Sequence, residues 1–360
     1  MARIEFKGLA HSYLDWPQEA ADYAVRHLDH VWEDGGAYAL LGPSGCGKTT
    51  LLNIISGLIH PSRGKVIFDG EDVTGLPTEQ RNIAQVFQFP VIYDTMTVFD
   101  NLAFPLRNRL IDEPEIRRRV HEVAEMLELE GDLPKRARGL TADAKQKISL
   151  GRGLVRSDVS AILFDEPLTV IDPQLKWHLR RKLKQIHEQF KLTLIYVTHD
   201  QNEALTFADQ VVVMNDGEVL QTGTPQQLFE QPSHKFVGFF IGSPGMNFLP
   251  CRFDGDNAIV ENIPIPLSPE MAARARNSRK KLELGIRPEF LQFDAAMTPG
   301  AVQVNIDDMA DLGSFTLVTA RIGARLIKIK IPEDGLVPGR QGWLTFPPEQ
   351  SLIYAAGEAI

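Results

Sequence analysis

Eight consecutive residues, 42–49, constrain the fold of this chain more than any other feature. They read Gly-Pro-Ser-Gly-Cys-Gly-Lys-Thr, the pattern G-x-x-x-x-G-K-[ST], and they join an apolar run at 37–41 to a helix-like run at 50–58. Glycines let the backbone approach a polyphosphate closely and aim N–H groups at it from the start of a helix. A glycine-rich turn with a chance Lys-Thr pair would not need a strand and a helix on either side. The stretch therefore predicts a nucleoside triphosphate site, formed by Gly42, Pro43, Ser44, Gly45, Cys46, Gly47, Lys48, Thr49 and Thr50.

Within this loop, two side chains have defined tasks. Lys48 supplies a positive charge for the β- and γ-phosphates, and Thr49 supplies a hydroxyl for Mg²⁺. Cys46 and Cys251 are the only cysteines in the sequence, too few for a disulfide framework. We expect Cys46 to be an exposed small residue of the loop rather than half of a bridge.

The composition is that of a globular protein with a large core. Of the 360 residues, 43% are hydrophobic and 24% are charged, which suits one large or two ordinary domains. No apolar run reaches the roughly 18 residues of a membrane-spanning helix. The first five residues carry no apolar signal-peptide stretch, so we expect a cytosolic protein. The net charge of −9 argues against a general nucleic-acid-binding surface.

Further polar residues follow other buried strands. An apolar run at 161–164 ends in Asp165 and Glu166, a short strand at 83–88 ends in Gln88, and the β-branched run at 192–198 is followed by His199. In a doubly wound sheet, the carboxyl ends of such strands lie beside the phosphate loop. Asp165 is then placed to hold Mg²⁺, and Glu166 to orient or deprotonate an attacking water. Two acids before a proline can also cap a helix, and an isolated histidine is more often structural.

The order of the elements indicates two domains. Strands and helices alternate up to about residue 231, with a largely helical insert from Phe89 to about Arg156, in which Ile116, Val120, Val123 and Leu127 recur at helical spacing. A basic amphipathic helix is expected at 175–190, most simply as a solvated outer face. Residues 232–250 are rich in glycine and proline and predict a linker. Beyond it, short β-like runs predict a small barrel or sandwich; these runs lie at 258–260, 282–286, 301–306, 315–321, 325–331 and 342–346.

With these residues in place, the chain resembles the ATP-binding subunits of ABC transporters, in the branch that serves carbohydrate and polyol importers. Residues 42–49 match the Walker A motif, and residues 161–165 match Walker B. The single-residue matches are Gln88 to the Q-loop, Glu166 to the catalytic glutamate, Asp172 to the D-loop and His199 to the switch histidine. The stretch 236–249 resembles the hinge into the accessory domain of sugar-importer subunits, and 285–289, Gly-Ile-Arg-Pro-Glu, resembles that domain's own signature.

The resemblance implies an α/β P-loop nucleotide-binding domain at 1–235, with a helical subdomain at about 89–158, a hinge at 236–250 and an OB-like β-barrel regulatory domain at 251–360. It implies ATP and Mg²⁺ as cofactors, with Thr49, Gln88 and Asp165 at the metal and Gln88, Glu166 and His199 in hydrolysis. Among Tyr13, Trp16 and Tyr23, which cluster before the phosphate loop, Tyr13 is the residue expected to stack on adenine. The implied partners are a second ATPase subunit, two transmembrane permease subunits and, indirectly, a solute-binding protein, at the cytoplasmic side of the plasma membrane. The segment 89–97 is the expected docking surface for the membrane subunits.

One stretch departs from the family pattern. Where the family carries Leu-Ser-Gly-Gly-Gln, the signature loop that crosses to the partner subunit's γ-phosphate, this chain has Leu140, Thr141, Ala142, Asp143 and Ala144. Thr141 keeps a hydroxyl, whereas Ala142 and Asp143 lose the freedom of glycine, and Asp143 brings a carboxylate toward an anion. We therefore expect a partner site that hydrolyses poorly and a heterodimer with a companion ATPase; a tolerated variant is the alternative.

Two rival functions belong to other classes. A soluble ABC-type ATPase acting on nucleic acid or ribosomes would show paired cassettes, a coiled-coil insert or a basic face, and a small-molecule P-loop kinase leaves Gln88, His199 and the C-terminal barrel unexplained. The sequence favours neither. The transported substrate is not encoded in this chain; the degenerate signature loop and the extra residues 14–23 resemble glycerol-importer subunits, which makes glycerol the specific hypothesis.

Overall fold

The chain folds into two compact units, Met1–Pro225 and Gln226–Ile360. The structure, a computed structural model, describes residues 2–156, 158–169, 171–335 and 339–360. The predicted domain border after residue 235 falls beyond helix α7 (Pro225–Glu230), whereas the division by contacts falls at the start of that helix. Within the described residues, none of the helices is both long and apolar enough to span a bilayer.

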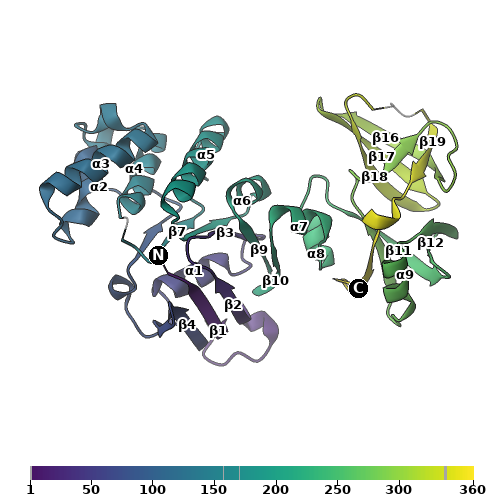
Figure 1. Ribbon diagram of the computed structural model, residues 1–360, viewed down its shortest axis with the longest axis horizontal. Helices are drawn as coiled ribbons and strands as arrows, with labels where there is room; N and C mark the ends of the chain where they lie inside the picture. Colours follow the sequence, from purple (N-terminus) through teal and green to yellow (C-terminus); the bar gives the residue numbers. More distant parts are fainter. Residues whose placement is uncertain (1, 157, 170, 336–338) are drawn as a thin grey trace. The chain divides into compact units, whose positions relative to one another are not determined.

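A six-stranded, mostly parallel sheet forms the centre of unit 1 (Figure 1). Its strand order is β10-β9-β3-β8-β7-β6, and only the β9–β10 hairpin is antiparallel. The strands are β3 (Ala37–Leu41), β6 (Ile83–Val86), β7 (Ala161–Asp165), β8 (Leu194–Thr198), β9 (Gln210–Asn215) and β10 (Glu218–Gly223). All five residues of β3 are buried, as expected of a strand that is covered on both faces. The predicted strand at 37–41 is confirmed residue for residue, and the apolar run at 161–164 lies in β7, which ends at Asp165.

A second sheet, antiparallel and four-stranded, shares a core with the first. Its order is β2-β1-β4-β5, with β1 (Ile4–His11), β2 (Val25–Trp32), β4 (Arg63–Phe68) and β5 (Glu71–Asp72). Phe6 of β1, Leu40 of β3 and Leu51 of helix α1 (Lys48–Ser56) belong to one buried cluster. Helix α1 therefore packs with both sheets, which holds the loop that precedes it in place.

The helical insert consists of α2 (Val98–Arg107), α3 (Glu113–Leu127) and α4 (Ala142–Leu154), which pack on one another (Figure 1). The predicted core positions of α3, namely Ile116, Val120, Val123 and Leu127, are all buried.

The expected start of the helical pattern at Phe89 is wrong, because the first helix begins only at Val98. The side chain of Asn101 takes up the backbone N–H and carbonyl of Tyr93, at 2.8 and 3.0 Å, so this segment is stabilised as an irregular loop. Helices α5 (Pro173–Phe190) and α6 (Gln201–Phe207) complete the unit.

Unit 2 is built mainly from two antiparallel sheets with a common core. The six-stranded sheet has the order β13-β12-β11-β14-β20-β21, and the five-stranded sheet has the order β15-β19-β16-β17-β18. The strands of the first are β11 (Asn247–Asp254), β12 (Asn257–Val260), β13 (Ile263–Pro266), β14 (Leu282–Ile286), β20 (Leu352–Ala355) and β21 (Glu358–Ala359). Those of the second are β15 (Gln292–Asp294), β16 (Val302–Asp311), β17 (Phe315–Ile322), β18 (Arg325–Pro332) and β19 (Gln341–Thr345). Helices α8 (Lys235–Phe240) and α9 (Pro269–Arg276) belong to this unit.

The predicted loop-like linker at 232–250 is partly wrong, because α8 and the first residues of β11 occupy it. The reason is a tertiary contact that no local pattern contains. The guanidinium of Arg287, which is fully buried, donates to the carbonyl oxygens of Gly238 and Ile241 at the end of α8 and to those of Leu228 and Phe229 in α7. Carbonyls at a helix end need such donors, so one side chain stabilises both short helices.

Candidate functional site

The phosphate loop lies between β3 and α1, and its backbone requires glycine. Gly45 and Gly47 have φ of +82° and +101°, a region that other residues avoid. A Cβ on Gly47 would lie 2.0 Å from the carbonyl oxygen of Ala24, and one on Gly42 would lie 2.2 Å from that of Met214. The side of the loop that faces Ala24 and Met214 is therefore packed against the protein, and the opposite side is the one that can face a ligand.

The Lys48 side chain lies inside the loop and binds its backbone. It is buried, and Nζ donates to the carbonyl oxygens of Gly42 at 2.8 Å and Pro43 at 2.9 Å. Nζ also lies 3.8 Å from Cys46 Sγ, so none of these three partners of the ammonium is a carboxylate. Cys46 is also buried, so the expectation that it is exposed is wrong; it is a free thiol, as expected, and burial raises its pKa.

Thr49 and Asp165 form an oxygen pair at the mouth of the loop. Thr49 Oγ1 donates to Asp165 Oδ1 over 3.2 Å. Burial, and the neighbouring Glu166, raise the pKa of Asp165, while Thr49 and Lys48 act in the opposite direction. Such a desolvated carboxylate beside a hydroxyl fits a hard divalent cation, which prefers oxygen ligands. Among the described residues there is no cluster of three or more His, Cys, Asp or Glu side chains that could hold a metal.

Glu166 follows β7 directly and meets His199, which follows the adjacent strand β8. Glu166 Oε1 lies 3.0 Å from His199 Nδ1, and Glu166 Oε2 accepts from Thr169 Oγ1 at 3.3 Å. The backbone of Glu166 is left-handed, with φ of +46°, a strained conformation of the kind found at functional sites. The two parallel strands therefore bring a carboxylate and an imidazole together at one sheet edge.

Gln88 lies near the same edge. It follows β6, which pairs with β7 so that Val86 faces Phe164, and its side chain is half-buried. The predicted strand at 83–88 is wrong at its end, because β6 stops at Val86 and Gln88 lies in a bend two residues beyond it.

Tyr13 lies over α1. Its hydroxyl is 3.0 Å from Thr50 Oγ1, its ring packs edge-on against His11, and 65% of its surface is exposed. The ring is therefore held near the phosphate loop with a free face. Trp16 is even more exposed, at 84%.

The stretch 140–144 forms the start of α4. Thr141 is the N-cap and accepts from the backbone N–H of Ala144 at 3.3 Å, with Asp143 in the first turn. Asp143 Oδ2 lies 3.7 Å from Lys147 Nζ, whereas Oδ1 is buried without a hydrogen-bond partner among the described residues. The carboxylate is thus turned back toward its own helix. Asp172, the remaining predicted residue, is exposed just before α5.

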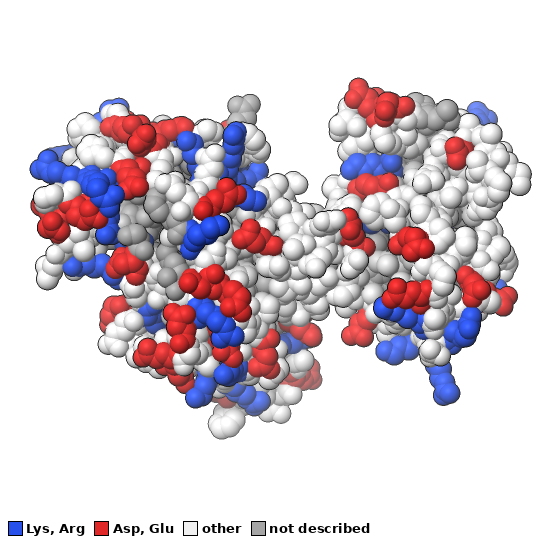
Figure 2. All heavy atoms as spheres, in the orientation of Figure 1, with Lys and Arg blue, Asp and Glu red and all other residues white. Residues whose placement is uncertain are grey.

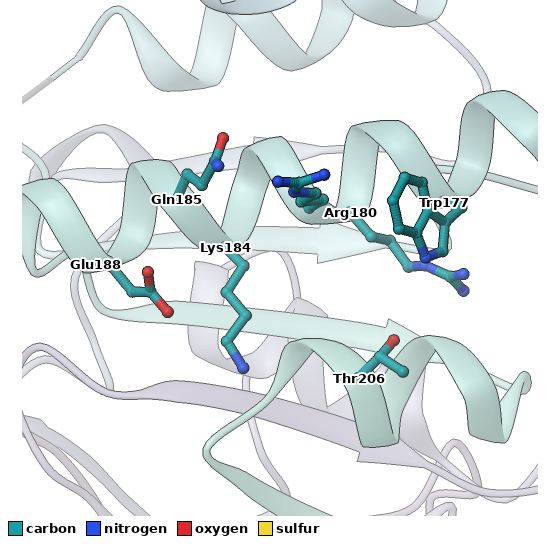
Figure 3. Close-up of a pocket in the computed structure, with 7 residues that line it drawn as sticks. Trp177, Arg180, Lys184, Gln185, Glu188 and Thr206 are labelled. Atoms are coloured by element: carbon teal, nitrogen blue, oxygen red, sulfur yellow. The ribbon is translucent and has the colours of Figure 1, made fainter.

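Two features escaped the sequence prediction. Thr169 braces Glu166, and the buried Glu203 accepts from Thr198 Oγ1, next to His199, at 2.7 Å. Thr169 follows Glu166 by three residues and Glu203 follows His199 by four, and this short spacing was the only sign in the sequence that they could act together. A cavity of about 340 Å³ between α5 and α6, lined by Trp177, Arg180, Lys184 and Thr206 among others (Figure 3), contains none of the predicted residues.

These features define a class of protein. A glycine-dependent phosphate loop, an oxygen pair for a cation and a carboxylate–imidazole pair share one edge of a parallel sheet, as in a P-loop nucleoside triphosphatase.

Comparison with known proteins narrows the class. The ABC transporter family matches residues 25–169, and the MalK OB fold domain matches residues 242–291. The sn-glycerol-3-phosphate import ATP-binding protein UgpC of Bordetella avium is 37% identical over 332 residues, which cover 92% of this chain and 89% of that protein. The uncharacterized ABC transporter ATP-binding protein YurJ of Bacillus subtilis is 35% identical over 341 residues, 92% and 91% of the two chains. Among solved structures, the ATP-binding cassette MJ0796, a post-hydrolysis dimer with ADP and Pi, is 27% identical with a TM-score of 0.55, over 62% of this chain and 98% of that one.

The chain belongs to the ATP-binding subunits of ABC transporters. It is a nucleotide-binding ATPase that is coupled to transport and works with membrane permease subunits, and its second unit carries a MalK-type OB fold domain. The predicted fold class and the predicted family are thereby confirmed.

Proposed function

We propose that this subunit hydrolyses Mg²⁺-ATP to drive the import of a carbohydrate or polyol. The observation that carries the proposal is the Glu166–His199 contact of 3.0 Å beside the Thr49–Asp165 pair. Bound Mg²⁺ would neutralise charge on the phosphates, held by Thr49, Asp165 and Gln88. Lys48 binds the β- and γ-phosphates, and Tyr13 stacks on the base.

Each residue at the strand ends has one task in this proposal. Glu166 accepts a proton from the attacking water, and His199 orients the Glu166 carboxylate and reaches toward the γ-phosphate. Thr169 holds the second carboxylate oxygen in place. Positioning and charge stabilisation of this kind supply most of the catalysis in phosphoryl transfer.

The second part of the proposal concerns assembly. ATP lies between two such subunits, so that residues 140–144 of each reach the nucleotide on the other, with Asp172 at the seam. The solved relative MJ0796 is itself described as dimeric. The subunits attach to the cytoplasmic face of the membrane through the irregular segment 89–97, where Phe89 and Val91 are 69% and 54% exposed, and a solute-binding protein delivers the substrate on the other side.

The signature loop leads us to propose a heterodimer with a companion ATPase. Ala142 and Asp143 replace the glycines that let the loop approach a phosphate, and Asp143 adds a negative charge. Lys147, 3.7 Å away, offsets part of that charge. The loss of backbone freedom is therefore the stronger of the two arguments.

Steady-state hydrolysis of ATP tests the assembly. The chain alone is expected to hydrolyse slowly, and addition of its companion is expected to restore turnover. Asp143→Gly removes the charge and restores the backbone freedom at this one position, whereas Asp143→Asn removes only the charge, so a larger gain with glycine at the companion's site is expected. Full activity of the lone homodimer, or no gain with either variant, contradicts the heterodimer.

For the substrate, we propose a small polyol or its phosphate ester. The UgpC relatives are named for sn-glycerol-3-phosphate import, and glycerol is the specific hypothesis from the sequence. Uptake of radiolabelled glycerol, glycerol 3-phosphate and maltose by cells with and without this subunit separates the three. Loss of maltose uptake alone would contradict the polyol proposal.

A soluble ATPase that acts on nucleic acid is the rival. On the face of unit 1 that Figure 2 shows, acidic and basic side chains are interspersed rather than gathered into a basic stripe. Stimulation of the ATPase by RNA or ribosomes, without membrane subunits, would favour the rival.

A further inference from the structure

A buried carboxylate lies behind the turn that carries His199. Glu203, on α6, is only 4% exposed. Its Oε2 accepts from Thr198 Oγ1 at 2.7 Å and from the Tyr196 hydroxyl at 3.1 Å, and its Oε1 lies 3.8 Å from Lys176 Nζ on α5. All of these partners belong to unit 1, in which α5 and α6 pack side by side (Figure 3).

The Thr198 hydroxyl connects this carboxylate to the backbone on the far side of His199, an arrangement that we call the bridge. It donates to Glu203 and at the same time accepts from the backbone N–H of Asp200 at 3.0 Å. Asp200 in turn caps α6 by accepting from the N–H of Asn202 at 2.8 Å. The residues on both sides of His199 are thus bound through one hydroxyl, and the last residue of β8 is connected to α6.

The free energy of burying Glu203 favours a role in positioning other residues over a role in stabilising the fold. A carboxylate taken out of water costs free energy unless it is fully paired, and apolar replacements are often as stable. Here two hydroxyls and a lysine 3.8 Å away contact the carboxylate. Thr198 ends β8 at the turn that carries His199, Tyr196 lies within β8, and Lys176 lies on α5, so the Thr198 contact is the one that acts on the turn. The Tyr196 phenol, whose pKa burial raises well above its ordinary value, stays a donor.

We propose that Glu203 is a positioning residue for hydrolysis: through the Thr198 hydroxyl it holds His199 at hydrogen-bond distance from Glu166. The bridge fixes the backbone on both sides of the histidine, and this sets the 3.0 Å contact between His199 Nδ1 and Glu166 Oε1. The inference rests on the function proposed above for His199.

The test uses the purified complete transporter and compares kcat, KM for ATP and thermal unfolding. Thr198→Val keeps the shape of the side chain and removes the bridge, so kcat should fall about tenfold with KM within about twofold, as expected when a reacting group is misplaced slightly. Thr198→Ser retains the hydroxyl and should restore kcat. Tyr196→Phe is the matched control, because it removes a donor to Glu203 but leaves the bridge, and its kcat should stay within about twofold of wild type.

The second arm is a double-mutant cycle with His199→Ala. In that background, Thr198→Val and Glu203→Leu should change the residual rate less than about twofold, because the group that they position is gone. If both reduce the rate by the same factor with and without His199, or if Thr198→Ser fails to restore kcat, Glu203 is structural and the inference is wrong. If His199→Ala itself keeps the wild-type rate, the function proposed for His199 is wrong instead.

Discussion

The imidazole of His199 lies 3.0 Å, measured from Nδ1, from Oε1 of Glu166, and this contact joins the ends of two neighbouring parallel strands. Neither residue is positioned by its own strand alone. Glu166 has a left-handed backbone and is braced by Thr169, and His199 lies on a turn that is tied to α6.

Replacement of Glu166 or of His199 should greatly slow ATP hydrolysis but not prevent ATP binding. Glu166→Gln and His199→Ala are each expected to lower kcat about a hundredfold or more, since they remove groups that act in the transition state. Nucleotide affinity should stay within a few-fold, because Lys48 and the loop are unchanged. Turnover and fluorescent-nucleotide titration of the transporter measure the two quantities. His178→Ala, which removes an exposed contact of 2.8 Å with Glu128, is the control. A weak effect at both Glu166 and His199 would argue against the site.

The hydroxyl of Thr49 should determine the Mg²⁺ requirement. Thr49→Ala removes one of the two oxygens in the Thr49–Asp165 pair, so half-maximal activity should need about tenfold more Mg²⁺. Thr49→Ser keeps the oxygen and should behave as wild type. A Mg²⁺ titration of ATPase activity gives the result, and an unchanged requirement in the alanine variant would show that Thr49 does not contact the ion.

Gly47 should not tolerate even a methyl group. Gly47→Ala places Cβ 2.0 Å from the Ala24 carbonyl oxygen at a φ of +101°, so the loop must rearrange and ATP binding should be lost. Gly70→Ala is the matched control, with a φ of +88° and open space around the added carbon; it should cost only about 1–2 kcal/mol of stability and leave binding intact. Equal affinities in the two variants would contradict the role of the close contact.

Arg287 should be necessary for the order of α7 and α8. Burial lowers its pKa to about 10, which leaves it charged near neutral pH. Arg287→Met removes the donor shared by four carbonyl oxygens, of which that of Gly238 keeps the Met246 N–H. We expect a loss of about 3 kcal/mol of stability and faster proteolysis between residues 229 and 242. Arg252→Lys alters an exposed side chain that bonds only Asn262 among the described residues, and it should have no effect. Calorimetry and limited proteolysis of the full chain distinguish these outcomes.

Both cysteines should react slowly in the native protein. Burial raises the pKa of Cys251 to about 11 and also raises that of Cys46. A raised thiol pKa lowers the thiolate fraction at every pH below it, so at pH 8 labelling by a thiol reagent should be slower than for free cysteine and should accelerate on unfolding. The variants Cys46→Ser and Cys251→Ser assign the two rates; fast native labelling of Cys46 would contradict its burial.

Local patterns in the sequence were sufficient for the phosphate loop and its neighbours. The strand at 37–41, the loop at 42–49 and α1 are contiguous, so the glycine spacing and apolar runs were enough to place them in order, although α1 begins at Lys48 rather than at the expected residue 50. The same holds for Asp165, Glu166 and His199, because the ends of buried parallel strands meet at one edge whatever the rest of the chain does.

What only the tertiary structure decided are the features made by residues far apart in the chain. Four features depend on such partners. They are the burial of Cys46, the irregular segment at 89–97, the helix α8 in a stretch that looks like a linker, and the positioning of His199 by Glu203. Arg287 shows the physical reason most clearly: a single guanidinium satisfies helix-end carbonyls 46 to 59 residues away. Hydrophobic periodicity and turn residues report on a few neighbouring positions, whereas a buried hydrogen bond depends on what the fold brings within about 3 Å.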